Sequence, residues 1–216
     1  MKRFLFTSII ILFSYVKISA TAQIPDIVYY NGNKYDLLCN PLERYFNSHP
    51  DKRPATVSSS TALERGYRAT FEIQDGTLHL KDIQIIQSPM NDENRWKSVM
   101  SEIFPDSELK KINWFTGLLR IPVGKLKKQI NMGYESVYEK YLLLEVKGGK
   151  LLKEKQLADK DYKKFKEKQL YAFKKAKEYN ELISFLKKSN PSIANDEIDT
   201  ILTKNILDYS PKIYTE

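Results

Sequence analysis

Apolar and polar residues alternate along three pairs of neighbouring segments, and a short turn-forming sequence joins each pair. The pairs are Ile27–Tyr30 with Asn33–Leu37 around Asn31-Gly32, Tyr67–Ile73 with Thr77–Ile86 around Gln74-Asp75-Gly76, and Val137–Val146 with Lys150–Leu157 around Lys147-Gly148-Gly149. Alternation places side chains on opposite faces of a strand, and these turn residues tolerate the positive φ angles of tight hairpins. The pattern predicts three β-hairpins, with a bulge near Asp82, where the alternation is interrupted.

Other periodic segments lie between and after the hairpins. Trp114–Ile121 predicts a strand that ends at Pro122 and Gly124, and Leu126–Ile130 predicts a short strand after it. Apolar residues that recur every three or four positions predict helices. The predicted helices cover Leu42–Phe46 after Pro41, a segment from Asn91 or Asp92 to Phe104 with Trp96, Val99, Met100 and Ile103 on one face, a segment from Asp159 or Asp161 to Lys188, and Asn195–Leu207.

The segment that ends at Lys188 predicts a long helix, because it contains neither glycine nor proline. Its apolar stripe includes Phe165, Phe173 and Ile183. The strand Val137–Val146 is apolar on both faces, so a second layer is expected to cover it. We therefore expect this helix to pack across the sheet with its lysines in solvent; a bend at Asn180 and a coiled coil with another chain are the alternatives.

The N-terminus has the pattern of a secretory signal peptide. Lys2 and Arg3 precede an apolar run, Phe4–Val16, and Ala20-Thr21-Ala22 provides a small-residue cleavage site. As a helix this run would be only about 20 Å long, whereas a bilayer core is about 30 Å thick. We expect residues 1–22 to be removed, a mature chain from Gln23 without a transmembrane span, and a periplasmic or secreted location. Residues 23–216 are expected to form one domain, mainly β over 23–157 and helical over 158–216.

Positive charge is concentrated in one part of the chain. The formal net charge of +8 falls to +5 without the signal peptide, and residues 147–188 carry 14 lysines against six acidic residues. This segment contains no arginine, the residue best suited to bidentate recognition of bases and phosphates. The composition therefore argues against a nucleic-acid partner and favours either a solvated lysine face or attraction to an acidic partner.

Motifs for catalysis or metal binding are not recognisable in the sequence. The two histidines, His49 and His79, lack metal-ligand spacing, and no nucleophile elbow or phosphate-binding glycine loop occurs. Cys39, the only cysteine, follows two leucines and is expected to be buried. Pairs of acids such as Glu135 and Glu139 would suit glycoside hydrolysis, but such pairs are common in charged chains. We expect no cofactor and no metal.

The best candidate for a binding surface is a cluster of aromatic and charged residues. It covers residues 113–120 and 131–141, where tyrosine and tryptophan alternate with glycine, arginine and glutamate. Large rigid rings provide contact area at low entropic cost, and charges fix orientation. The predicted surface residues are Arg120, Tyr134, Glu135 and Tyr138.

Three segments carry a family resemblance. They are Ser59–Gly76, Leu119–Gly124 and Gly133–Glu139. Over about residues 25–157 the chain resembles a group of uncharacterised exported bacterial proteins with no assigned activity. The resemblance implies no catalytic residue and does not extend to the lysine-rich helix.

Together these patterns predict an α+β fold, in which a twisted antiparallel sheet built from hairpins carries a long C-terminal helix. The expected function is that of an exported, non-catalytic binding protein of the bacterial envelope, such as an inhibitor or immunity-type partner of another protein. Its partner would be another protein or an acidic envelope component. An envelope hydrolase that uses paired carboxylates is the alternative; it would need a pocket in which titratable groups converge, whereas a binder would expose aromatic residues.

Overall fold

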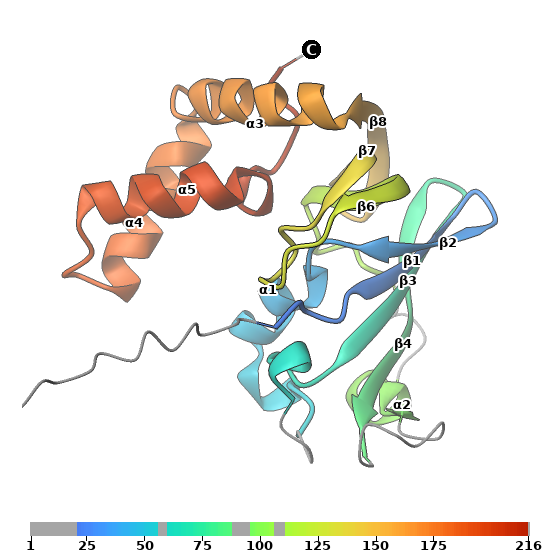
Figure 1. Ribbon diagram of the computed structural model, residues 1–216. Helices are drawn as coiled ribbons and strands as arrows, with labels where there is room; N and C mark the ends of the chain where they lie inside the picture. Colours follow the sequence, from blue (N-terminus) through green and yellow to red (C-terminus); the bar gives the residue numbers. More distant parts are fainter. Residues whose placement is uncertain (1–20, 56–59, 88–95, 106–110, 216) are drawn as a thin grey trace, which may run out of the picture.

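The chain forms an α+β fold around one strongly curved, mostly antiparallel sheet (Figure 1). The computed structural model describes residues 21–55, 60–87, 96–105 and 111–215. Within them the strand order is β2-β1-β3-β4-β8-β7-β6, and β5 pairs with β4. The strands are β1 Asp26–Tyr30, β2 Asn33–Leu37, β3 Arg68–Gln74, β4 Thr77–Ile86, β5 Trp96–Ser98, β6 Gly117–Lys128, β7 Val137–Lys147 and β8 Lys150–Ala158. Only β1 and β3 are parallel neighbours.

All three predicted hairpins are confirmed, and so is the bulge. Asn31 and Gly32 have φ angles of 50° and 75°, as a type I′ turn requires. The pairing of β3 with β4 shifts by one residue between Asp82 and Leu80. At the third turn, a Cβ on Gly149 would lie 2.3 Å from the carbonyl oxygen of Ile112, so only glycine lets this turn approach the chain there.

The two halves of the sheet meet at the hairpin turns and enclose the main core. Strands β4 and β8 pair only at Thr77 and Lys150, and from there the halves curve toward each other. The core between them takes Phe71 and Leu80 from one half and Leu144 from the other. At the far ends, the main-chain N–H of Leu38 donates to the carbonyl of Arg120 in β6 at 2.8 Å, which brings the two end strands together.

The helical part covers the outer face of β6 and β7, as Figure 1 shows. It consists of α3 Asp159–Phe173, α4 Lys177–Ser189 and α5 Asn195–Tyr209. Helices α3 and α5 contribute Phe165, Phe173 and Ile206 to a second core with Leu143 of β7. Strand β7 is therefore covered on both faces, as predicted. Among the described residues, no helix has the length and hydrophobicity needed to cross a membrane.

The prediction of one unbroken helix to Lys188 is wrong. The helix ends at Phe173 and a new one starts at Lys177, with Ala176 in an extended conformation. The break lets Tyr179 turn back onto Phe173, and their rings meet edge to face at 5.8 Å. A straight helix of this length would extend about 45 Å and carry its last apolar residues beyond the sheet.

Two other predicted elements are corrected. Trp96–Ser98 is strand β5 on the edge of β4, and helix α2 covers only Met100–Ile103; the predicted start at Asn91 or Asp92 lies outside the described residues. Strand β6 begins at Gly117 rather than Trp114 and continues through Pro122 and Gly124. An end strand has only one hydrogen-bonded neighbour, so it can accommodate proline, which has no main-chain N–H to donate.

The remaining helical segments lie at the edges of the sheet. They are α1 Pro41–Ser48 and the short 3₁₀ turns Pro50–Lys52 and Thr61–Leu63. Helix α1 starts at Pro41, as predicted, and buries Leu42 and Phe46. Its opposite side faces α4 and α5, where it forms one wall of a pocket.

Candidate functional site

A pocket of about 540 Å³ lies between α1 and the pair α4 and α5; we call it the α1–α4 pocket. The α1 wall is polar, and the α4 wall is apolar. The lining residues are Cys39, Asn40, Pro41, Glu43, Arg44, Asn47, Ser48, Phe115, Leu118, Arg120, Tyr134, Leu182, Phe185, Asp208 and Tyr209. Cavities of roughly 300–1,000 Å³ are the usual size of small-molecule sites.

The base of the pocket contains an ion pair between the sheet and α5. Arg120 lies on the helix-facing side of β6, and its Nη2 donates to both carboxylate oxygens of Asp208, at 2.7 and 3.0 Å. Burial acts to lower the pKa of Arg120, but Asp208, together with Tyr162 and Cys39, outweighs burial, so the pKa of Arg120 is raised. Burial raises the pKa of Asp208, although Arg120 and then Arg44 act in the opposite direction.

Arg44 connects α1 to two other segments. Its guanidinium donates to the main-chain carbonyl of Thr116 and to that of Asp208, the latter at 2.6 Å from Nη2. It also lies over the Phe115 ring, 5.5 Å from the ring centroid. The carbonyls at the end of a helix lack partners within it, so Arg44 satisfies one such group at the end of α5.

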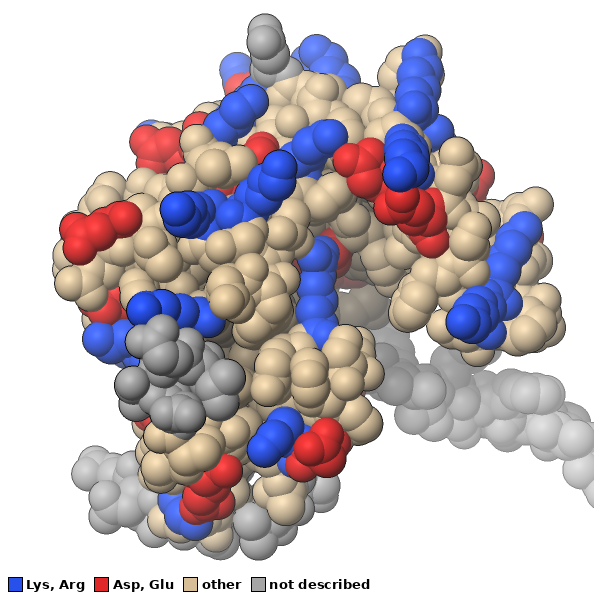
Figure 2. All heavy atoms as spheres, turned by 180° about the vertical axis from the view of Figure 1, so that it is seen from behind, with Lys and Arg blue, Asp and Glu red and all other residues tan. Residues whose placement is uncertain are grey.

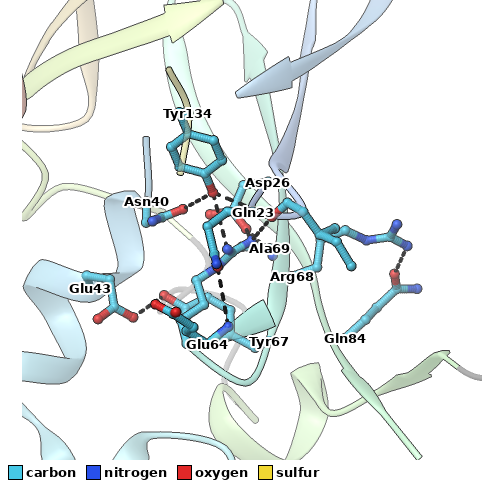
Figure 3. Close-up of polar contacts among 12 residues, drawn as sticks. Gln23, Asp26, Asn40, Glu43, Glu64, Tyr67, Arg68, Ala69, Gln84 and Tyr134 are labelled. Carbon is cyan, nitrogen blue, oxygen red and sulfur yellow. Dashed lines mark hydrogen bonds and ion pairs between the residues drawn. The ribbon is translucent and has the colours of Figure 1, made fainter. Parts of the chain in front are cut away.

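Behind the pocket, Tyr134 joins it to a buried polar network. Figure 3 shows Tyr134 pointing toward Asn40 and Asp26. The hydroxyl of Tyr134 donates to Asn40 Oδ1 at 2.9 Å and accepts from Arg65 Nη1 at 3.2 Å. Burial raises the pKa of this hydroxyl, and Arg65 partly counteracts the rise. Tyr134 therefore ties the segment before β7 to the start of α1.

The centre of that network is a carboxylate with no exposed surface. Asp26 Oδ1 accepts from Arg65 Nη2 and from the Ala69 main-chain N–H, both at 2.8 Å. Asp26 Oδ2 is buried without a hydrogen-bond partner, as is Arg65 Nε. Burial raises the pKa of Asp26 from 3.8 to about 6, against the influence of Arg65.

Glu43, the second acidic residue of the pocket, is also held by an arginine. Its Oε1 accepts from Arg53 Nη1 at 3.0 Å and from the Tyr67 hydroxyl at 2.8 Å, and its Oε2 accepts from Arg53 Nη2 at 2.9 Å. Both pocket carboxylates, Glu43 and Asp208, are therefore engaged by guanidinium groups. Carboxylates that are held in this way fix the shape of a site more readily than they exchange protons.

The predicted surface residues fall in different places. Arg120 and Tyr134 line the α1–α4 pocket. Tyr138 lines a second pocket, of about 400 Å³, between the end strands β2 and β6. Glu135 is exposed, and neither pocket includes it. Glu139 accepts a hydrogen bond from the Lys125 main-chain N–H at 3.0 Å.

Sequence reasoning missed Arg44, Asp208 and Phe185. Asp208 carries a usable signal, because an acidic residue in the last turn of a helix is unfavourable unless a cation compensates it. The signal for Phe185 appears only in the structure, where α4 is amphipathic and yet contains no buried residue. Arg44 carries no such local signal, because its partners lie 72 and 164 positions along the chain.

The described residues offer little for nucleophilic or metal chemistry. They contain no group of three or more histidine, cysteine or acidic residues placed to hold a metal ion. Cys39 is buried, as predicted, and burial raises the pKa of its thiol to about 12. The thiol is therefore protonated near neutral pH, and only thiolates are effective nucleophiles or metal ligands.

Comparison of the chain with protein-family models, curated proteins and solved structures finds no significant match. The resemblance to exported bacterial proteins over residues 25–157 therefore stays a prediction. A functional proposal for this chain rests on its own sequence and geometry.

Proposed function

We propose that this chain is an exported, non-catalytic binding protein of the bacterial envelope, and that the α1–α4 pocket holds its partner. The observation that carries the proposal is the apolar wall provided by α4. Phe185 on this wall is 65% exposed, and Leu182 beside it is only partly buried. Leaving large apolar side chains exposed around a concave surface is a common property of binding sites.

The state of the titratable groups favours binding over catalysis. The carboxylates of Asp208 and Glu43 are each engaged by an arginine, and the Cys39 thiol is protonated. The alternative, a hydrolase that uses Glu135 and Glu139, would require the two groups to face a common cavity, and neither residue lines either of the two pockets described above. The preformed polar floor and the exposed apolar wall suit a ligand that is held and released unchanged.

Charge supports an acidic partner. The segment 159–189, which contains α3 and α4, carries ten lysines and five acidic residues. Figure 2 shows lysine and arginine side chains spread over the upper part of one face, with acidic side chains between them. A surplus of positive charge raises the rate of encounter with acidic partners, and salt weakens the effect.

The export part of the proposal rests on the N-terminal sequence pattern. Gln23, the expected first residue of the mature chain, belongs to the folded domain: its side-chain amide donates to the Thr61 carbonyl at 2.7 Å and its main-chain N–H donates to the Gly133 carbonyl at 3.2 Å. Cleavage after Ala22 would keep all of these contacts. Mass spectrometry of protein from the native host should find an N-terminus at or near Gln23, and a soluble form that keeps Met1 would contradict export.

Site-specific photo-crosslinking in the native host tests the pocket. A benzoylphenylalanine at position 185 should capture the partner, whereas the same residue at position 171 should not. Tyr171 is the matched control because it is 67% exposed on the same helical part but does not line the pocket. Equal crosslinking at both positions, or none at 185 in protein of normal abundance, would rule out this pocket as the binding site.

A further inference from the structure

We propose that the α1–α4 pocket recognises an oxyanion carried on an apolar body, a fatty-acid-like carboxylate, and that the guanidinium of Arg44 binds the anion. This inference rests on the proposed function, because it names the ligand class of the same pocket. The observation behind it is that Arg44, at the pocket floor, forms no ion pair with a carboxylate among the described residues.

Two arginines share one carboxylate there. Arg120 and Arg44 both line the pocket, and Asp208 attracts both of them. Asp208 forms its ion pair with Arg120 only, and Glu43 is occupied by Arg53. The hydrogen-bond partners of Arg44 are two main-chain carbonyls, which carry no formal charge. Within the part of the chain that the structure describes, one positive charge of the pocket thus has no carboxylate of its own.

The guanidinium is held in place for such a contact. The Phe115 ring supports it, and Gly117 leaves the space that it fills: a Cβ at Gly117 would lie 3.3 Å from both terminal nitrogens of Arg44. Arginine has five N–H donors, and Arg44 uses two of them in the hydrogen bonds described above. Three N–H donors remain, and the N–H groups of a guanidinium are well suited to bind a carboxylate or another oxyanion.

The other side of the pocket suits an apolar chain. Leu182 and Phe185 of α4 face the polar α1 wall across a volume of about 540 Å³. Phe115 also lines the pocket, and its ring lies against the guanidinium of Arg44. A ligand with one negatively charged end and one apolar end would contact both walls at once.

Calorimetric titration with two ten-carbon amphiphiles of opposite charge tests the inference. Decanoate carries the carboxylate, and decyltrimethylammonium serves as the matched cation. Both are titrated, below the concentration at which they form micelles, into the full mature chain and into Arg44→Gln, Arg44→Lys and Lys52→Gln. Lys52 is the control for general electrostatic attraction, because it is exposed close to α1 but does not line the pocket. Thermal melts monitor the fold of each variant.

We expect the wild type to prefer decanoate and Arg44→Gln to weaken decanoate binding by roughly tenfold or more, as for loss of a charge-assisted hydrogen bond. Arg44→Lys should keep part of the preference, and Lys52→Gln should keep all of it. The ratio of the affinities for the two ligands, measured within one variant, remains informative even where a substitution lowers stability. Equal affinity of the wild type for both amphiphiles, no binding of decanoate, or equal losses in Arg44→Gln and Lys52→Gln would overturn the inference. Selective crosslinking at position 185 alongside such a result would leave the binding function standing and reject only the anionic ligand.

Discussion

Substituting Asp26 with asparagine should destabilise the protein more at pH 4 than at pH 7. An ion pair whose carboxylate has a lowered pKa would give the opposite trend, because its contribution to stability appears as the carboxylate ionises. Asp26 has no exposed surface, its Oδ2 lacks a hydrogen-bond partner, and burial raises its pKa from 3.8 to about 6 in spite of Arg65. Burial therefore affects the pKa of Asp26 more than the attraction of Arg65 does.

The raised pKa fixes the sign and the size of the effect. Between pH 3.8 and about 6 the folded state binds more protons at Asp26 than the unfolded state. The stability that this residue contributes is therefore complete below pH 3.8 and is lost as the pH rises through about 6. One pKa unit corresponds to about 1.4 kcal/mol, so the total change is on the order of 3 kcal/mol.

Urea unfolding of the wild type and of Asp26→Asn at pH 4, 5, 6 and 7 measures this change directly. Other carboxylates titrate in both proteins, so the difference between the two free energies of unfolding isolates position 26. Asp51→Asn, at an exposed carboxylate, is the control for removal of one charge. A cost of Asp26→Asn that grows as the pH rises would show that Arg65 outweighs burial, and the reasoning would be refuted.

Four further substitutions test the core and the surface. Phe173→Ala should lower the free energy of unfolding by about 3–5 kcal/mol, because Phe173 is 1% exposed. Phe185→Ala on the neighbouring helix should change it by less than about 0.5 kcal/mol, and similar costs in thermal melts of the two variants would contradict the packing of α3. Cys39→Ala should lower the free energy of unfolding by about 1–2 kcal/mol. The native thiol should react with maleimide only as fast as the protein opens locally, so rapid labelling would argue against its burial. Lys164→Glu, on the exposed side of α3, should leave the melting temperature nearly unchanged and weaken the capture of an acidic partner at low salt; a loss that persists at high salt would contradict an electrostatic role.

The sequence by itself determined the turns and the faces of the strands. The φ preferences of Asn31 and Gly32 are properties of single residues, so the hairpin they form needs no information from the rest of the chain. The apolar residues on both faces of β7 likewise predicted that both faces are covered, and the leucines beside Cys39 predicted its burial. These features depend on neighbours within a few positions, where steric preference and hydrophobic period act directly.

Only the tertiary structure decided where the elements end and which polar groups meet. Trp96 belongs to a strand because β4 offers an edge with which to pair, and helix α3 ends at Phe173, where Tyr179 of the next helix packs back onto it. Arg44 and Asp208 come together from helices at opposite ends of the chain, and no sequence pattern near either residue predicts this contact. Contacts of this kind gain their free energy from burial and charge compensation that exist only once the sheet has curved and the helices have docked on it.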